Sequence, residues 1–170
     1  MIELIHGRGQ LGTALKDLIK NKKVDLKEDW FIYHTWNFID KSENVQREEY
    51  EKFKEFVDKH KGVNILFIST LSENHTPYEH YKQLSEAYLL QNSDKGFIVR
   101  LSNLIGKGIC ERFKKGEAKP YGTLELMAVE EAAIRILKFL SSDKKLIHIK
   151  NLHGSKVDAG LAYNLIRFGK

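Results

Sequence analysis

The sequence predicts a three-layer α/β fold, in which helices cover both faces of a parallel sheet of about five strands. Short apolar runs alternate with longer amphipathic segments along the chain, as expected for parallel strands joined through helices. One run, Val63 to Ser69, is apolar at nearly every position, which is typical of a strand buried on both faces. With 170 residues the chain is long enough for a core, and we expect a single domain over residues 1–170.

The boundaries of the elements follow from periodicity and from residues that start helices. Tyr50 and Phe53 recur at helical spacing on one face of a charged segment. Pro77 suits the first turn of a helix, and Ser155 suits a helix cap. Residues 109–123 are basic and contain glycine, and we expect them to be irregular. The expected strands are residues 2–6, 30–36, 63–69, 96–101 and 146–149, and the expected helices are residues 11–19, 44–61, 77–91, 124–140 and 155–168.

Composition excludes several classes of protein. No apolar run approaches the roughly 20 residues of a membrane span, and no signal-type segment opens the chain, so we expect no membrane partner. The net charge of +5 comes from scattered lysines, which we interpret as solvated surface rather than as a nucleic-acid footprint. The single cysteine, Cys110, excludes an internal disulfide and fits a reducing cytoplasm. Neither Cys110 nor the seven histidines show the spacing of metal ligands, and no metal site is expected.

A glycine-rich turn joins the first expected strand to the first helix. Its pattern is Gly-x-Gly-x-x-Gly, in which Gly7 allows a tight turn, Gly9 lets the backbone approach a diphosphate, and Gly12 lets helix and strand pack closely. The free N–H groups of the helix would face the phosphates. The pattern predicts a nucleotide-binding turn, although an ordinary strand-to-helix turn that needs glycine gives the same letters. The whole turn comprises Gly7, Arg8, Gly9, Gln10, Leu11 and Gly12.

A second pattern predicts proton-transfer chemistry. Tyr78 and Lys82 stand four residues apart at the start of a helix and therefore share one face. A nearby ammonium lowers the pKa of a tyrosine hydroxyl, and the hydroxyl of Thr70, at the end of the preceding strand, could hold a substrate oxygen. These groups suit proton transfer to or from an alcohol or ketone. A Tyr-x-x-x-Lys match also arises by chance in a chain with this many tyrosines and lysines.

Taken in order, these segments resemble the short-chain dehydrogenase/reductase superfamily, and specifically its extended branch of nucleotide-sugar epimerases, dehydratases and reductases. The likeness runs over nearly the whole chain. Besides the glycine turn and the Tyr–Lys pair, it rests on the segments Asp29–Trp36, Asn44-Val45, Ile68–Thr70, Arg100–Gly106 and Met127–Ala133.

The resemblance implies a role for each matched residue. Tyr78 would be the general acid/base, Lys82 would lower its pKa and touch the nicotinamide ribose, and Thr70 would orient the substrate oxygen. Thr35 would lie on the strand beneath the nicotinamide, and Asn44 would hold its helix and a water. Those implied roles require NAD or NADP, with its diphosphate at Gly7 to Gly12. In the same comparison, Asn103 would contact the substrate, a nucleotide sugar or related carbohydrate.

The chain also departs from that family. Only one helix separates the glycine turn from the Trp30 strand, so two strand–helix units of the usual fold would be absent. In that fold, these units form the half of the sheet that holds the adenosine. The far end of the Trp30 strand offers no carboxylate for a ribose hydroxyl. Alternatively, residues 30–35 are the second strand and later units are missing, but Asn44-Val45 favours the first alignment. In both alignments the sheet is trimmed, and the N-terminal strand could lie at an edge.

Two functions remain open from the sequence. The first is a compact NAD- or NADP-dependent enzyme that reduces, epimerises or dehydrates a nucleotide sugar through a keto intermediate. The second is a non-catalytic Rossmann-fold relative that has lost dinucleotide binding and serves as a binding or dimerising protein. In that alternative, the edge strand exposed by the missing units could pair with a second chain to form a homodimer.

Overall fold

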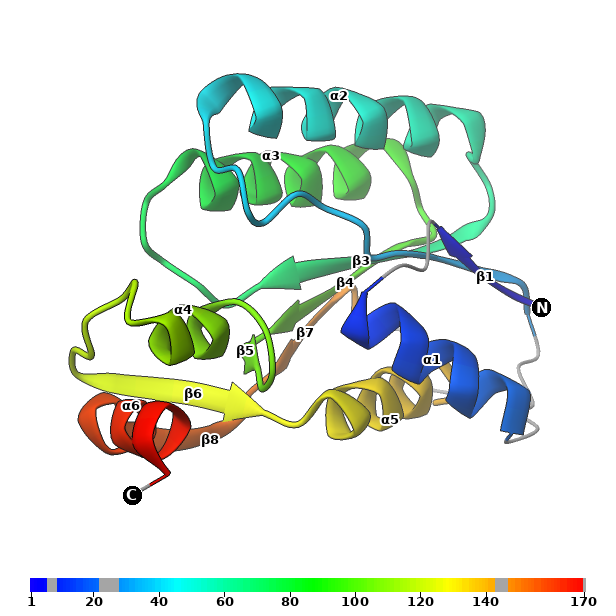
Figure 1. The fold of residues 1–170 in the computed structure, drawn as a ribbon. Helices are drawn as coiled ribbons and strands as arrows, with labels where there is room; N and C mark the ends of the chain where they lie inside the picture. Colours follow the sequence, from blue (N-terminus) through cyan, green and yellow to red (C-terminus); the bar gives the residue numbers. More distant parts are fainter. Residues whose placement is uncertain (6–8, 22–27, 143–146, 170) are drawn as a thin grey trace.

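A five-stranded parallel sheet forms the centre of the molecule. The computed structural model describes residues 1–5, 9–21, 28–142 and 147–169. The strands lie in the order β1-β2-β3-β4-β7, and every neighbouring pair is parallel, which confirms the predicted α/β class (Figure 1). Their bounds are β1 Ile2–Ile5, β2 Trp30–Tyr33, β3 Asn64–Thr70, β4 Gly96–Leu101 and β7 Ile149–Leu152.

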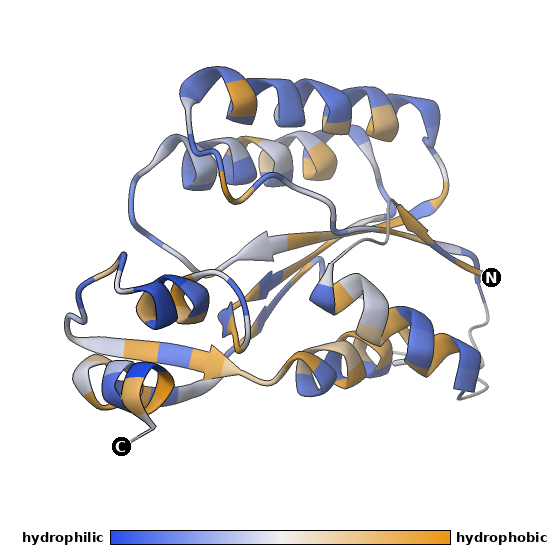
Figure 2. Cartoon of the chain, in the orientation of Figure 1, coloured by the Kyte–Doolittle hydropathy of each residue, from blue (hydrophilic) through white to orange (hydrophobic). Residues whose placement is uncertain are grey.

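Two helices cover each face of this sheet. α1 (Gln10–Asn21) packs against α5 (Val129–Leu140) on one face, and α2 (Glu43–Lys59) packs against α3 (Pro77–Asn92) on the other (Figure 1). Figure 2 shows α2 as a mostly hydrophilic helix with a minority of hydrophobic residues. Among these, Phe53 is fully buried, as expected of an amphipathic helix on a sheet. The three predicted layers are therefore present.

The central strand β3 is buried on both faces, as its sequence predicts. Ile65 and Phe67 contribute to the core under α2 and α3, whereas Leu66 and Ile68 contribute to the core under α1 and α5. This alternation follows from the two-residue period of a strand. Burying four large apolar side chains at 6% exposure or less makes β3 the strand on which both cores depend.

β1 lies at one end of the sheet order, so the N-terminal strand is at an edge. β2 lies between β1 and β3, the place that the first alignment above requires. The steps from β1 to β2 and from β2 to β3 run in the same direction across the sheet, yet α1 and α2 lie on opposite faces. These two crossovers therefore have opposite hands, although parallel crossovers are almost always right-handed. Of the two, the unusual crossover is the one through α1, because α1 lies on the face of α5 and not on the face of α2 and α3.

A smaller sheet lies beyond the carboxyl ends of the main strands (Figure 1). β5 (Asn103–Leu104) pairs parallel with β6 (Thr123–Met127), and β6 pairs antiparallel with β8 (Ser155–Asp158). α4 (Ile109–Lys115) and α6 (Ala159–Phe168) pack on each other, with the rings of Phe113 and Tyr163 5.3 Å apart. Within the described ranges, no helix is long and apolar enough to span a membrane.

Several of the sequence-based expectations in this region are wrong. Residues 109–115 form a helix instead of an irregular segment, and residues 123–127 form a strand instead of the start of a helix. Residues 155–158 are also a strand, and the cap of the last helix is Asp158, whose carboxylate accepts from the Leu161 backbone N–H at 2.8 Å. The fifth strand begins at Ile149 rather than at Leu146, which lies outside the described residues. For β6, β7 and β8, pairing with a distant strand outweighs local propensity.

Candidate functional site

The structure describes the second part of the glycine turn, from Gly9 to Gly12. Gly9 has φ +108°, which favours glycine, and its carbonyl accepts from both the backbone N–H and the hydroxyl of Thr13 at 3.0 Å. Gly7 and Arg8 lie outside the described residues.

The remaining residues of that turn serve two purposes. Leu11 and Gly12 are buried, and Leu11 belongs to the core under α1 and α5. Gln10 instead lines an open cleft of about 730 Å³, together with Gly9, Thr13, Lys107 and other residues. Among the described residues of this turn, Gln10 is the one whose side chain lines the cleft.

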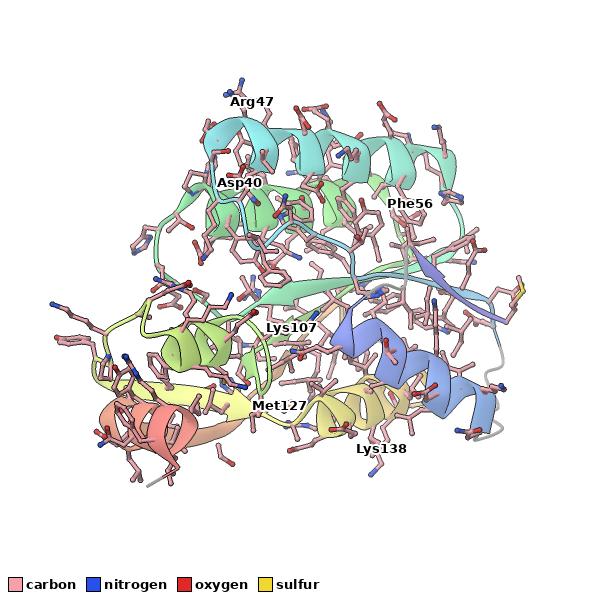
Figure 3. All side chains as sticks on the ribbon, viewed as in Figure 1. Asp40, Arg47, Phe56, Lys107, Met127 and Lys138 are labelled. Atoms are coloured by element: carbon pink, nitrogen blue, oxygen red, sulfur yellow. The ribbon has the colours of Figure 1, made fainter. Side chains whose placement is uncertain are left out.

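This cleft lies between the N-terminal ends of two helices. α1 contributes Gln10, Thr13 and Asp17, and α5 contributes Val129 and Glu130. The connection after β5 contributes Lys107, which is labelled in Figure 3. A Cβ on Gly106 would lie 2.8 Å from the Gln10 side-chain oxygen, so that connection packs tightly on α1. Backbone N–H groups at two helix starts and the Lys107 ammonium favour an anion, whereas the carboxylates of Asp17 and Glu130 in the same lining oppose one.

The start of α3 is fixed by a capping box. Pro77 is the first helical residue, and the carboxylate of Glu79 accepts from the Thr76 backbone N–H at 3.1 Å and from the Ser72 hydroxyl at 2.8 Å. Glu79 is only 2% exposed, and Lys41 lies 3.6 Å from it. These contacts hold the short connection between Thr70 and Tyr78 in one conformation.

Lys82 is buried against aromatic rings. Its ammonium donates to the Ile68 carbonyl at 2.7 Å and lies 4.6 Å from the ring centres of both Trp36 and Phe67. The side chain is 3% exposed. Burial lowers the pKa of Lys82 to about 7, although the nearby charges of Glu86 and Glu49 act in the opposite direction. At neutral pH the residue therefore exchanges between charged and neutral forms.

Tyr78 lies beside Lys82, as the four-residue spacing predicts. The Lys82 nitrogen is 5.9 Å from the centre of the Tyr78 ring. Burial, and after it the negative charge of Glu79, raises the pKa of Tyr78 above its ordinary value. The expected lowering of this pKa by Lys82 is not found, because burial and Glu79 dominate.

Thr70 is the last residue of β3 and is half-buried. Its hydroxyl oxygen accepts from the Ser72 backbone N–H at 3.0 Å, which starts the turn toward α3. Thr70 lies two residues beyond Ile68, the residue that accepts from Lys82. The structure thus brings Thr70, Tyr78 and Lys82 to adjoining elements at the carboxyl end of β3.

The side chain that ties the start of α2 to the preceding connection is Gln46, and the expected role of Asn44 toward its helix and a water stays a prediction. Asn44 is exposed in the first turn of α2, whereas Gln46 is fully buried. The Gln46 amide donates to the carbonyls of Asn37 at 2.7 Å and Asp40 at 2.5 Å, and its oxygen accepts from the Trp36 indole at 2.7 Å. One signal could have found it, because Gln46 continues the stripe of buried residues at helical spacing on α2.

Asn103 and Thr35 are the remaining predicted residues. Asn103 is exposed on β5, and its amide donates to the Glu125 carbonyl at 3.4 Å. Thr35 is half-buried just beyond β2. Among the described residues, no three His, Cys, Asp or Glu side chains gather as metal ligands would.

Comparison with known proteins identifies the fold. No family model matches the sequence, and a search of curated proteins found no match. Among solved structures, a dTDP-4-dehydrorhamnose reductase from Clostridium acetobutylicum matches with a TM-score of 0.75 and 16% identity, covering 97% of this chain and 78% of that chain. The Bacillus anthracis dTDP-4-dehydrorhamnose reductase in complex with NADP gives 0.74 and 14%, covering 97% and 79%.

A third neighbour has a different named activity. The dTDP-glucose 4,6-dehydratase from Streptomyces venezuelae, with NAD bound, has a TM-score of 0.70 and 11% identity, covering 97% of this chain and 79% of that chain. Identities this low show the fold alone. The chain therefore has the Rossmann-like fold of the extended short-chain dehydrogenases/reductases, a group that includes reductases, epimerases and dehydratases of nucleotide sugars.

Proposed function

We propose that this chain is a compact short-chain dehydrogenase/reductase-type enzyme that acts on a nucleotide sugar or a related carbohydrate. The reaction would be reduction, epimerisation or dehydration through a keto intermediate. The observation that carries the proposal is the grouping of Thr70, Tyr78 and Lys82 at the carboxyl end of β3. In open α/β sheets, ligands bind at this end of the strands. The fold likeness to enzymes of nucleotide sugars supports the same substrate class.

Each of the three residues has a chemical task in this proposal. Tyr78 passes a proton to or from the substrate oxygen, and the hydroxyl of Thr70 donates to that oxygen and orients it. The ammonium of Lys82, when charged, donates to a sugar hydroxyl. NAD or NADP, when bound, would supply the hydride transfer.

The described residues fit one half of such a cofactor better than the other. Gly9, Gln10 and the N-terminus of α1 would hold the diphosphate, and Thr35 and Lys82 would meet the nicotinamide end. The adenosine half has no matching surface, because β1 lies at the edge where the missing strands would continue the sheet. We therefore expect weaker cofactor binding than in a complete fold of this type.

The direct test is turnover with Tyr78→Phe. The variant removes one hydroxyl and keeps the ring, so we expect the fold and NADPH binding to remain while turnover falls by at least a hundredfold. Tyr121→Phe is the matched control, since Tyr121 is 94% exposed, and it should keep full activity. Full activity of Tyr78→Phe would remove Tyr78 from the mechanism.

A non-catalytic, dimerising protein is the second candidate, and two observations favour it. The edge of β1 offers backbone groups that a second copy could pair with, and burial raises the pKa of Tyr78 away from the range useful for proton transfer. Titration of tryptophan fluorescence with NADH and NADPH separates the candidates. No response at millimolar cofactor, together with a dimer in sedimentation equilibrium, would favour this second candidate over the enzyme.

A further inference from the structure

Lys82 is in an unusual environment for a lysine. It is 3% exposed, and among the ion pairs of the described residues none includes it. Lysine is rarely buried to this degree without a carboxylate partner, because the ammonium loses its hydration. Here one carbonyl and the faces of aromatic rings take the place of water around the ammonium.

The indole of Trp36 is one of the aromatic rings around the Lys82 ammonium. Trp36 is 9% exposed, and its ring centre lies 4.6 Å from the Lys82 nitrogen and 5.8 Å from the ring centre of Phe67. Phe67 lies on β3 and Tyr78 on α3, whereas Trp36 lies three residues beyond the end of β2, in the connection to α2. Of these three aromatic residues, Trp36 is the one that lies outside any helix or strand.

Gln46 holds the Trp36 ring in place. Its side chain joins the Trp36 indole to the carbonyls of Asn37 and Asp40, so one amide fixes both the ring and the backbone of the connection. Figure 3 shows Asp40 close to the first turns of α2, the helix that carries Gln46. Turning the indole away would break the Trp36–Gln46 hydrogen bond and the packing of the ring on Phe67.

We propose that Trp36, positioned by Gln46, is a gate that controls access of ligands to the ammonium of Lys82. The inference rests on the proposed function, because that function requires Lys82 to meet a hydroxyl of a bound sugar or ribose. A ligand with a pair of sugar hydroxyls can open the gate, since its oxygens replace the ring faces around the ammonium. A ligand without hydroxyls at that place leaves the indole on Lys82. Trp36 and Gln46 are thus specificity and positioning residues.

Chemical labelling of lysines tests the gate without any cofactor. Reductive methylation followed by peptide mass spectrometry gives the rate at each lysine, and the exposed Lys41 serves as an internal standard. Lys82 should react slowly in the wild-type protein and at least tenfold faster in Trp36→Ala and Gln46→Met. Trp36→Phe keeps a ring and should restore part of the protection. Trp30→Phe is the control, because Trp30 packs on Phe97 in the other core, and it should leave Lys82 protected.

The wild-type protein provides a second measurement in case the variants fail to fold. A gate opens locally, so labelling of Lys82 should not change with low concentrations of urea. If only global unfolding exposes Lys82, its labelling rate will rise with urea along the slope of global unfolding, and the gate is overturned. Folded Trp36→Ala and Gln46→Met proteins with unchanged Lys82 rates would also overturn it.

The outcomes separate the gate from the proposed function. Fast labelling of Lys82 in both variants, without NADPH binding, would uphold the gate and contradict the enzyme. In Trp30→Phe protein, Trp36 is the remaining tryptophan of two, and NADPH should shift its emission as the ring leaves Lys82. NADPH binding, seen from the fluorescence of the cofactor, with unchanged Trp36 emission would uphold cofactor binding and contradict the gate.

Discussion

The burial of Lys82 decides how the charge of this site depends on pH. The Tyr-x-x-x-Lys spacing correctly predicts that Tyr78 and Lys82 lie on one helix face, because that face follows from helical geometry alone. It does not predict the depth of Lys82, since depth depends on Trp36 and Phe67, which come from other elements. A four-residue spacing therefore gives the pairing of two side chains but not the pKa of either.

The low pKa of Lys82 predicts that stability rises with pH. The native pKa is about 7 and the ordinary value is 10.5, so between these values the unfolded chain binds more protons than the native one. The free energy of unfolding should therefore increase from pH 7 to pH 9, by up to about 1.4 kcal/mol per pH unit. Above that window the raised pKa values of Tyr33 and Tyr78 act in the opposite sense. Urea unfolding at several pH values measures this increase.

Lys82→Met is the matched variant for the pH experiment. It keeps an unbranched chain of similar length and removes the ionisable group, so its stability should vary little from pH 7 to pH 9. A wild-type protein that shows the same flat profile as Lys82→Met would contradict the assignment of this slope to Lys82.

Gln46 and Asn44 allow a second comparison of single residues. Gln46→Ala leaves the Trp36 indole and two backbone carbonyls without their partner, and it should cost about 2–3 kcal/mol of unfolding free energy. Asn44→Ala removes an exposed side chain and should change stability by no more than about 0.5 kcal/mol. Chemical denaturation measures both values. Equal costs would contradict the assignment of the buried role to Gln46.

At the scale of elements, the hydrophobic pattern predicts the bounds of a strand when the segment itself contains a run of apolar residues. β3 and β4 lie within one residue of their expected bounds because both are almost wholly apolar. β6 and β8 were missed because their paired residues lie 29 to 35 positions apart in the sequence, and about half of their side chains are exposed. A short strand in a small sheet owes its existence to a partner that sequence pattern does not reveal.

The start of α6 provides a prediction at this scale. Asp158 caps the helix through its carboxylate, so Asp158→Ala should lower the unfolding free energy by about 1 kcal/mol, whereas Asp158→Asn should retain most of it. Ser155 lies in β8 and makes no cap, so Ser155→Ala should fall within about 0.5 kcal/mol of the wild type. A larger loss of unfolding free energy in Ser155→Ala than in Asp158→Ala would support a helix that starts at Ser155, as the sequence predicts.

At the scale of the molecule, the main sheet shows three features together. β1 lies at an edge, β2 lies between β1 and β3, and the crossover through α1 has the opposite hand to its successor. The resemblance stated above predicts the first two, because one helix stands between the glycine turn and the Trp30 strand where the extended short-chain dehydrogenases/reductases would have three. It could not predict the hand, which depends on the face that α1 occupies, and that face is set by packing against α5.

The central claim is that a ligand with a nicotinamide end reaches Lys82 despite the trimmed sheet. A crystal of the protein soaked with millimolar NADP tests this most directly. We predict density for a diphosphate beside Gly9 and Gln10, a ribose within hydrogen-bond distance of the Lys82 nitrogen, and Trp36 turned away from that nitrogen. An empty cleft at that concentration, with Trp36 still stacked on Lys82, would contradict the account.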